Sequence, residues 1–544
     1  MLQVIRSWVY CRGCQRKNKN KSSISTTYIK NDILNKLMNT TSEKIGQLIY
    51  QVRQEKGLTQ AEFAKRLQTS QSAVNRIEHG HQNLSMDMLG RISDVLNKQI
   101  ISLNTNTVSL RIEGGYELSG EITLKTSKNA AVALICASLL NKGTTRLKKV
   151  ARIEEVNRLI EVLQSIGVKV RWLPGNDLEI KPPAKLDLEA MHKEAARKTR
   201  SVIMFIGPLM HLYKEFKIPY AGGCELGRRT VAPHLYALEE FGVDVITKSG
   251  HYKVTVNKHL PKRSVVLYES GDTTTENILM AAASIKGETV IKMASANYMV
   301  QDLCFYLQKL GVKIDGIGTS TLRVQGVTDI RKNVTYAPSE DPVEGMTFIS
   351  AAVTTNSSIT IRRAPIDFLE LELLKLEKMG LKYDISEIYK AENGKTDLCD
   401  LVIHKHNGEL RAPIEKLHPN VFPGLNIDHL PYFVPIAAVA KGRTLIHDWI
   451  YEDRALMYTE MKKIGVDIEL ADPHRAFVNG PTRWRAADLV CPSGIRPAVM
   501  ILIGMLAANG TSMLRNVYTI NRGYEDLAER LNSLGARIGV VHEV

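Results

Sequence analysis

Long hydrophobic runs are missing from this chain of 544 residues. A helix needs about 20 apolar residues in a row to cross a bilayer, and no such run occurs. The start, Met1 to Val9, is too short and too polar for a secretory signal. With 44% hydrophobic residues the chain can still bury large cores, and its length suggests about three domains. These features predict a globular protein of the cytoplasm that does not associate with a membrane.

Cysteine is also scarce. The seven cysteines are odd in number and scattered along the chain, which indicates a reducing compartment and excludes a disulfide framework. Cys11 and Cys14 form a Cys-x-x-Cys pair, but no second Cys/His pair at metal spacing accompanies it. We therefore assign no metal site to it.

Acidic residues are outnumbered, and the net charge is +15. The excess is concentrated in residues 1–41, where eight lysines and arginines face one aspartate and give +7. Together with its Asn, Lys, Ser and Thr bias, this charge predicts a disordered tail over residues 1–43, an arm able to attract nucleic acid. The alternative is that translation starts at Met38 and the tail is not made.

Short helical segments follow in residues 44–104. Apolar residues recur there at helical spacing, with breaks at Gly57 and Gly80. Thr59 and Ser70 precede two such segments, where a hydroxyl is a favoured N-cap. Small or branched residues are expected to pack between the two helices: Ala64, Val74 and Ile77.

The second of these helices would present polar side chains of the kinds that reach base edges and phosphates. With one residue from the first helix, the candidate DNA-binding residues are Gln60, Gln71, Ser72, Asn75 and Arg76. The segment resembles the Cro/C1-type (XRE family) helix-turn-helix, with Gln68 where that family usually has glycine, so strain of about 1 kcal/mol is expected there. The resemblance implies DNA binding as a dimer on a two-fold site. A helical domain that only mediates protein contacts is the alternative.

One pattern occurs six times between residues 107 and 544: a helical segment ends in an apolar residue and glycine, and a strand-like start follows. The glycines are Gly167, Gly242, Gly311, Gly380, Gly465 and Gly535. Each lies where a helix C-cap needs positive φ before a strand. The spacing of about 70 residues is too long for a solenoid and fits a βαβ-rich subdomain used six times. The pattern predicts an α/β protein of two pseudo-symmetric halves with a cleft between them.

Three stretches have the chemistry of an anion site. Ala221 to Arg229, AGGCELGRR, sets Cys224 among glycines that allow tight backbone turns and arginines that lower the pKa of a thiol and bind phosphate or carboxylate. Lys128 and Asn129 enter an apolar helix, where ammonium, amide and free backbone N–H groups would meet. Arg522 lies beside a glycine before the last helix. Taken singly, each is equally compatible with an ordinary surface feature.

Together these features resemble the enolpyruvyl transferases over residues 107–544. The matching motifs are Ser127 to Ala131, Gly222 to Arg229, Thr275 to Ala282, Glu344 to Phe348 and Arg522 to Tyr524. The resemblance implies an inside-out α/β fold of two halves with three units each, preceded here by the helix-turn-helix domain. One half would comprise residues 107–127 plus 340–544, and the other, with the cysteine loop, residues 128–339.

The resemblance also implies the reaction: transfer of an enolpyruvyl group from phosphoenolpyruvate to the 3-hydroxyl of UDP-N-acetylglucosamine, with release of phosphate, as the first committed step of peptidoglycan synthesis. It implies no metal or organic cofactor. Cys224 would protonate the methylene carbon and Asp428 would accept the hydroxyl proton, while Lys128 and Arg522 complete the catalytic set. We expect partial desolvation and nearby substrate phosphates to raise the pKa of Asp428 towards that of a working base.

By the same motif matches, the substrate-binding residues are Lys128, Asn129, Arg200, Arg229, Thr230, Val231, Ala232, Pro233, Asp428, Ile450, Arg454 and Arg496. Their positive groups, preorganised in a closed cleft, would stabilise charge in the intermediate. The segment from Arg229 to His234 departs from the family's Arg-Pro-Val-Asp-Leu-His and lacks the carboxylate that faces the base. Glu269 lies where a lysine near the diphosphate is common.

Other functions remain open. The shikimate-pathway transferase shares the fold, but that branch lacks the cysteine of the loop. A transcription regulator whose transferase-derived part senses a nucleotide sugar fits the fused helix-turn-helix, but a sensor has no use for the proton donor Cys224. An enzyme that also binds DNA, as a homodimer, combines both.

Overall fold

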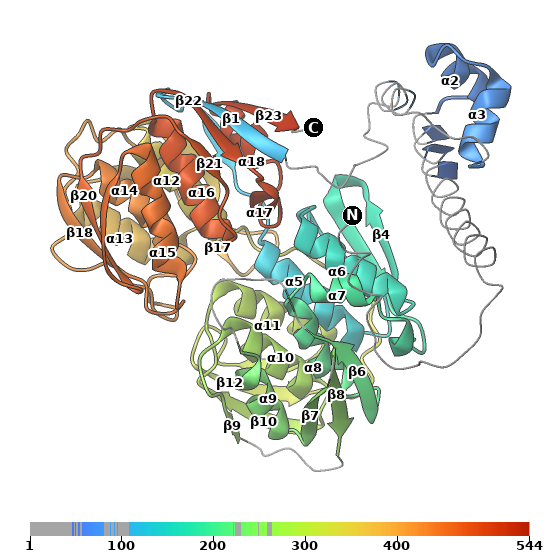
Figure 1. Cartoon of the computed structure of the whole chain (residues 1–544). Helices are drawn as coiled ribbons and strands as arrows, with labels where there is room; N and C mark the ends of the chain where they lie inside the picture. Colours follow the sequence, from blue (N-terminus) through green and yellow to red (C-terminus); the bar gives the residue numbers. More distant parts are fainter. Residues whose placement is uncertain are drawn as a thin grey trace, which may run out of the picture. The chain divides into compact units, whose positions relative to one another are not determined.

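The computed structural model describes residues 108–542 except 221, 223–229, 249 and 258–263. Of the first 107 residues it describes 57–80 together with 46, 47, 49, 50, 53, 54, 88, 92 and 95. The chain divides into two compact units, one from Met1 to Asn106 and the other from Thr107 to Glu543. Each is described by itself (Figure 1).

The first unit contains the two predicted helices, α2 (Gln60–Arg66) and α3 (Gln71–Glu78). Both predicted N-caps are confirmed, since the hydroxyl of Thr59 accepts from the N–H of Glu62 and that of Ser70 accepts from the N–H of Ala73. Glu62 in turn accepts from the backbone N–H of Thr59 at 2.8 Å, which completes a capping box. The predicted packing residues are buried in a core of Ile49, Phe63, Ala64, Leu67, Val74, Ile77 and Ile92.

The turn between α2 and α3 is strained at the expected residue, because Gln68 has a φ of 52°. A left-handed conformation costs a non-glycine residue about 1–2 kcal/mol. We therefore expect Gln68→Gly to stabilise this unit by about 1 kcal/mol, measured as slower hydrogen exchange of the α2 and α3 amides. Gln68→Ala, which keeps a Cβ, is the matched control and should gain nothing. Equal or faster exchange in Gln68→Gly would show that the turn is not strained.

The second unit is built from repeats of one motif, in which a buried helix leads to a strand, a second helix and two further strands. The first copy comprises α5 (Lys128–Ala137), β3 (Thr145–Leu147), α6 (Glu154–Ser165), β4 (Lys169–Leu173) and β5 (Asp177–Lys181). Because β5 pairs antiparallel with both β3 and β4, those two strands run parallel with β5 between them. The predicted βαβ arrangement is therefore a split one, whose two parallel strands are not neighbours.

The next two copies follow the same order. The second comprises α8 (Ile206–Leu209), β6 (Glu215–Pro219), α9 (Ala232–Glu239), β7 (Val243–Lys248) and β8 (His251–Val256). The third comprises β9 (Ser264–Val266), α10 (Asp272–Ala283), β10 (Gly287–Lys292), α11 (Tyr298–Leu310), β11 (Lys313–Asp315) and β12 (Thr321–Gly326). Strand β13 (Val334–Tyr336) then returns to pair parallel with β3.

The last three copies complete the unit. The fourth has β2 (Glu121–Thr123), α12 (Pro342–Thr354), β14 (Ile359–Pro365), α13 (Glu370–Lys378), β15 (Tyr383–Ile385) and β17 (Asp397–Ile403). The fifth has α14 (Phe433–Val439), β18 (Gly442–His447), α15 (Arg454–Tyr458), β19 (Asp467–Asp472) and β20 (Arg475–Gly480). The sixth has β21 (Asp488–Val490), α16 (Ile495–Ala507), β22 (Gly510–Arg515), α17 (Tyr518–Asn521), α18 (Leu527–Ser533), β23 (Arg537–His542) and β1 (Val108–Gly114).

The sixth copy takes its central strand from the start of the unit. β1 lies between β22 and β23 and is antiparallel to both, so a blue strand stands among red ones in Figure 1. β2 likewise pairs with β14. The described strands form six sheets in all, with the orders β13-β3-β5-β4, β6-β8-β7, β11-β12-β10-β9, β15-β17-β14-β2, β18-β20-β19 and β21-β22-β1-β23.

The repeat glycines have the predicted conformation. Their φ values are 92° at Gly167, 73° at Gly242, 102° at Gly311, 99° at Gly380, 101° at Gly465 and 97° at Gly535. The first helix of each copy lies inside the protein, as α12 illustrates, where all residues from Pro342 to Thr354 are buried. Strands such as β23 instead lie at the surface, with Ile538 as the one buried residue of that strand. The predicted inside-out α/β fold with six repeats is confirmed.

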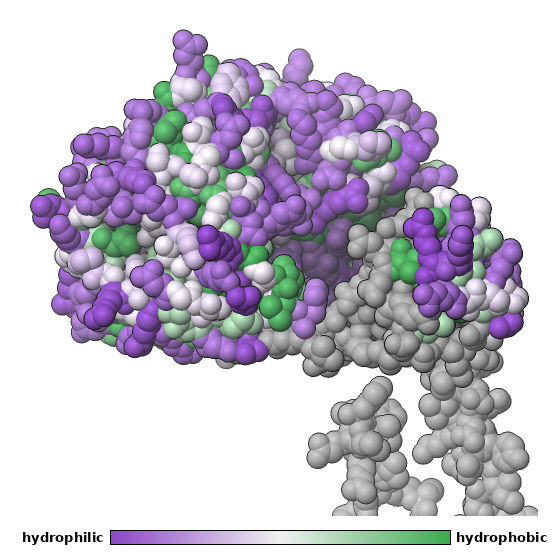
Figure 2. All heavy atoms as spheres, turned by 90° about the horizontal axis from the view of Figure 1, so that it is seen from above, coloured by the Kyte–Doolittle hydropathy of each residue, from purple (hydrophilic) through white to green (hydrophobic). Residues whose placement is uncertain are grey.

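Hydrophilic residues dominate the coloured surface seen in Figure 2, and hydrophobic ones occur in small groups. In the part of the chain that the structure describes, no helix has both the length and the apolar composition needed to cross a bilayer. Four of the cysteines fall in that part, and all are buried free thiols: Cys136, Cys304, Cys399 and Cys491.

Candidate active site

Three of the buried helices begin at one cavity of about 230 Å³. Lys128 is the first residue of α5, Asp272 the first of α10, and Arg496 the second of α16, and all three line the cavity. A helix N-terminus offers free N–H groups and the positive end of the helix dipole. Three such ends, with lysine and arginine beside them, make a site that favours anions.

Lys128 is held at the cavity by a carboxylate that sequence analysis did not single out. Its Nζ lies 2.9 Å from Oε2 of Glu155, and Oε1 of Glu155 accepts from the hydroxyl of Ser201 at 3.2 Å. Burial raises the pKa of Glu155, but Lys128 and, more weakly, Arg522 outweigh burial and hold that pKa below its usual value. The pair is therefore ionic, and the ammonium has a fixed position.

Asp428 lies beside Arg496 in the same cavity, with Oδ2 at 3.0 Å from the guanidinium. Burial raises the pKa of Asp428, but Arg496, Arg454 and Lys128 together outweigh it and lower that pKa to about 2. The expectation of a raised pKa is thus wrong for the protein without substrate anions. Three cations surround the carboxylate, and the sequence does not show that they lie so close to it.

Arg454 is one of the largest fully buried side chains of the protein. Its Nε and one terminal nitrogen donate to the carboxylate of Asp448 at 2.5 and 2.8 Å, and the hydroxyl of Tyr458 donates to the same carboxylate at 2.5 Å. The guanidinium also lies over the ring of Tyr451, 4.5 Å from its centroid. Asp448 and Tyr458 fix Arg454 at the wall of the cavity, and neither residue was predicted from the sequence.

A second cavity of about 480 Å³ adjoins the first. The two share Arg200, Asp272, Thr273, Asn297, Asn426, Ile427 and Tyr451. The second contains the predicted residues Thr230, Pro233 and Ile450, and Arg200 donates to the carbonyl of Thr230 at 2.7 Å. A substrate with two parts could therefore occupy both cavities at once.

The structure brings most of the predicted residues together. Lys128, Asn129, Arg200, Asp428, Arg454, Arg496 and Arg522 line the first cavity. Val231 and Ala232 line neither cavity, because they begin helix α9. Cys224 and Arg229 lie outside the described residues. Gly222 is described, and a Cβ there would come within 1.7 Å of the carbonyl oxygen of Arg197, so the backbones approach too closely for a side chain.

Further residues at the cavities were not predicted. Asp272 accepts from Ser295 at 2.6 Å and from Asn297 at 3.3 Å, and Asn129 donates to the hydroxyl of Tyr298 at 3.0 Å. The one sequence signal that could have found Asp272 is its place at the first position of a helix.

Burial lowers the pKa of His234, which lines the second cavity, to about 3, so this imidazole is neutral near pH 7. No group of three or more potential metal ligands occurs in the described part of the chain.

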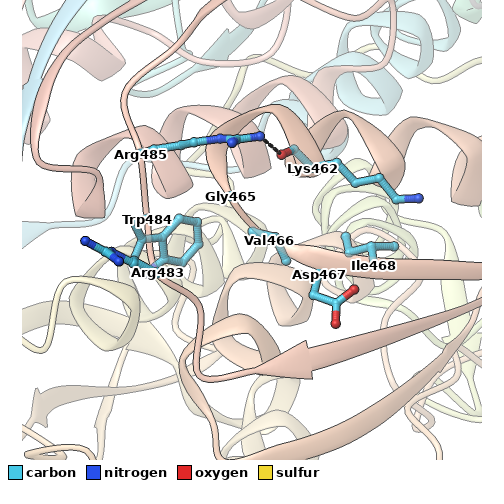
Figure 3. Close-up of a pocket in the computed structure, with 8 residues that line it drawn as sticks. All are labelled: Lys462, Gly465, Val466, Asp467, Ile468, Arg483, Trp484 and Arg485. Atoms are coloured by element: carbon cyan, nitrogen blue, oxygen red, sulfur yellow. Dashed lines mark hydrogen bonds between the residues drawn. The ribbon is translucent and has the colours of Figure 1, made fainter.

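A separate cavity of about 590 Å³ lies between the helical turn that ends before Gly465, the start of β19 and the loop that follows β20 (Figure 3). Its walls carry Lys462, Arg483, Trp484 and Arg485. The guanidinium of Arg485 donates to the carbonyls of Lys462 and Lys463, each at 3.2 Å, and so satisfies the C-terminus of the helix. None of the predicted site residues lines this cavity, and Arg485 has a structural role.

The helix-turn-helix unit presents a separate polar surface. On α3, Gln71, Ser72, Asn75 and Arg76 are exposed, while Ala73, Val74, Ile77 and Glu78 face the core. Gln60 differs from them, because it is partly buried and donates to Glu78 at 2.8 Å. Glu78 is in turn paired with the buried Arg53 at 2.5 Å. Four of the five predicted DNA-binding side chains are therefore available to a ligand, and the amide of Gln60 is engaged with the core.

The fold and the anion site define the class of protein. Residues 112–531 match the family model described as EPSP synthase (3-phosphoshikimate 1-carboxyvinyltransferase), and the chain belongs to this family. A second model, described as helix-turn-helix, matches residues 49–103.

Within the family, the chain is similar to curated proteins named UDP-N-acetylglucosamine 1-carboxyvinyltransferase. The relative from Nitratiruptor sp. is 31% identical over 433 residues, which cover 79% of this chain and 98% of the relative. Those from Bradyrhizobium diazoefficiens and Treponema pallidum are each 32% identical, with the same coverage.

Solved structures show the same fold. The enolpyruvyl transferase NikO from Streptomyces tendae has a TM-score of 0.69 at 21% identity and covers 81% of this chain and 100% of its own. EPSP synthase from Acinetobacter baumannii has a TM-score of 0.64 at 18% identity and covers 80% and 100%.

Proposed function

We propose that this protein transfers the enolpyruvyl group of phosphoenolpyruvate to the 3-hydroxyl of UDP-N-acetylglucosamine and releases phosphate, in the cytoplasm. The observation that carries the proposal is the first cavity, where Lys128, Arg454 and Arg496 surround the carboxylate of Asp428 and three buried helices begin. The names of the curated relatives support this acceptor over shikimate phosphate, and over a sensor without activity.

The cations would bind the phosphate and carboxylate of phosphoenolpyruvate. Lys128, Arg496 and Arg522 line the cavity from three different segments, so two anionic groups can be held at once. These contacts would stabilise the charge of a tetrahedral intermediate without further rearrangement. UDP-N-acetylglucosamine would extend into the second cavity, towards Thr230 and Ile450.

Asp428 would accept the hydroxyl proton as the sugar oxygen bonds to C2 of phosphoenolpyruvate, while Cys224 gives a proton to the methylene carbon. Loss of a proton from the new methyl group and cleavage of the C–O bond to phosphate then restore the double bond. Substrate anions would neutralise the cations around Asp428, so its pKa, about 2 in the free protein, would rise on binding towards that of a useful base.

A phosphate-release assay with both substrates tests the proposal. We expect phosphate only when both are present, and a large loss of rate in Cys224→Ala. Cys399→Ala removes a buried thiol that lines neither cavity, so this variant should keep the rate. An epoxide phosphonate of the fosfomycin type should alkylate Cys224, as peptide mass spectrometry would show. Release of phosphate without the acceptor, or none with it, would overturn this assignment.

We also propose that the first three copies of the repeat form one half of the transferase and the last three the other. Strands before Lys128 pair with strands after Glu340, in support of one half made of residues 107–127 plus 340–544 and another of residues 128–339. The first cavity, which is lined by residues of both halves, would then close on the substrates.

A second function, DNA binding as a homodimer, is favoured by the exposed polar face of α3. We expect retardation of duplex DNA at moderate salt, since arginine and amide side chains bind phosphates and bases. Gln71→Ala with Arg76→Ala should weaken the specific complex by at least about tenfold. Lys65→Ala, which removes one exposed positive charge from α2, is the control. Binding unchanged by the α3 variant would exclude recognition by that helix.

A further inference from the structure

Glu276 has no role in the proposed reaction, yet it lines the cavity that contains Lys128 and Asp428. It lies in α10, one helical turn after Asp272. The residue is 2% exposed, and its Oε1 is completely buried without a hydrogen-bond partner among the described residues. Buried polar atoms are almost always satisfied, so an unpartnered carboxyl oxygen at a cavity points to a ligand group.

The surroundings of Glu276 decide what that group can be. Asp272 is the nearest charge on its own helix, the packed helices α5 and α11 contribute the buried thiols Cys136 and Cys304, and the imidazole of His234 on α9 is neutral. Burial and the charge of Asp272 both raise the pKa of Glu276 well above its usual value. Both effects favour the neutral form of this carboxyl group, in which one oxygen donates and the other accepts.

We propose that Glu276 binds the acceptor substrate, through hydrogen bonds between its carboxyl group and an uncharged polar group such as a hydroxyl or an amide. A phosphate is excluded as its partner, because Asp272 adds negative charge and no cation is paired with Glu276 in the described residues. Glu276 would thus bind an uncharged group of the acceptor, while the lysine and arginines of the cavity bind the anionic groups. This inference rests on the proposed function for the identity of the acceptor.

Two variants of similar size test this role. Glu276→Gln keeps a neutral donor and acceptor and should leave the KM for UDP-N-acetylglucosamine within about threefold. Glu276→Leu removes both and should raise that KM by about tenfold or more, with the KM for phosphoenolpyruvate unchanged. Because Leu replaces an unpartnered buried polar group, its thermal stability should equal or exceed that of the parent. A loss of stability, an equal rise in both KM values, or no rise in either would contradict the proposal.

An infrared difference spectrum between the parent protein and Glu276→Gln provides a readout that does not depend on turnover. We expect the band of a protonated carboxyl group near pH 7, and a shift of that band when UDP-N-acetylglucosamine alone is added. Absence of the band, or a band that does not shift when the sugar nucleotide is added, would overturn the assignment of Glu276. A band that shifts in a protein that releases no phosphate would instead retain Glu276 as a binding residue and reject the proposed reaction.

Discussion

Asp428→Asn should lower kcat by about 10²–10⁴-fold, because it removes the only carboxylate placed against Arg496 in the described part of the cavity. An amide keeps the shape of the side chain but cannot accept the hydroxyl proton. Steady-state phosphate release at saturating substrates measures the effect. Asp488→Asn, on a partly exposed ion pair with Arg515, makes the same chemical change and should leave kcat unaltered.

The pH dependence of the parent enzyme provides a check on the same residue. Since kcat/KM reports the free enzyme, and the pKa of Asp428 is about 2 there, this carboxylate stays ionised down to strongly acidic pH. We expect no acid limb in kcat/KM from Asp428 at any pH where the protein remains folded. Retention of more than a tenth of kcat by Asp428→Asn would show that another group accepts the proton.

Asp448→Asn should destabilise the protein by about 3–5 kcal/mol, the largest stability effect that we expect from one polar substitution. Asp448 is fully buried and accepts two hydrogen bonds from Arg454 and one from Tyr458. The variant would leave the guanidinium of Arg454 buried at 1% exposure without its paired carboxylate. Urea unfolding followed by near-ultraviolet circular dichroism gives the free energy of unfolding.

The surface pair again serves as the matched control. Asp488 and Arg515 lie 2.6 Å apart at 52% and 41% side-chain exposure, where solvent screens the attraction, so Asp488→Asn should cost less than about 1 kcal/mol. Equal effects of the two variants would show that burial does not determine the contribution of Asp448. Because Asp448 also fixes Arg454 at the cavity, we expect its variant to bind substrate more weakly as well.

Local features of the fold could be predicted from the sequence because they depend on single residues. The glycines of the repeat, Gly311 and Gly465 among them, mark helix ends by a conformation that other residues avoid. The caps Thr59 and Ser70 follow from the same kind of local preference. Pairing of β1 with strands at the far end of the unit could not be predicted, since strand alternation specifies a face and not a partner.

The candidate site shows a similar division. Motif matches placed Lys128, Arg496 and Asp428 in one cavity, although the last two are 68 residues apart. The pKa of Asp428 could not be predicted, because it depends on the balance between burial and three cations whose positions only the fold provides. Glu155 and Asp448 were not predicted for the same reason, because the sequence does not indicate which basic side chain an acidic residue will pair with in the fold.

The identity of the product tests the account most directly. The full-length protein should convert phosphoenolpyruvate and UDP-N-acetylglucosamine into a sugar nucleotide heavier by one enolpyruvyl group, with an equal amount of phosphate, and mass spectrometry with fragmentation should place the group on the 3-oxygen. Asp428→Asn should form almost none of it. An unmodified sugar nucleotide after incubation with active, folded protein, or an enolpyruvyl group on a different acceptor alone, would contradict the account.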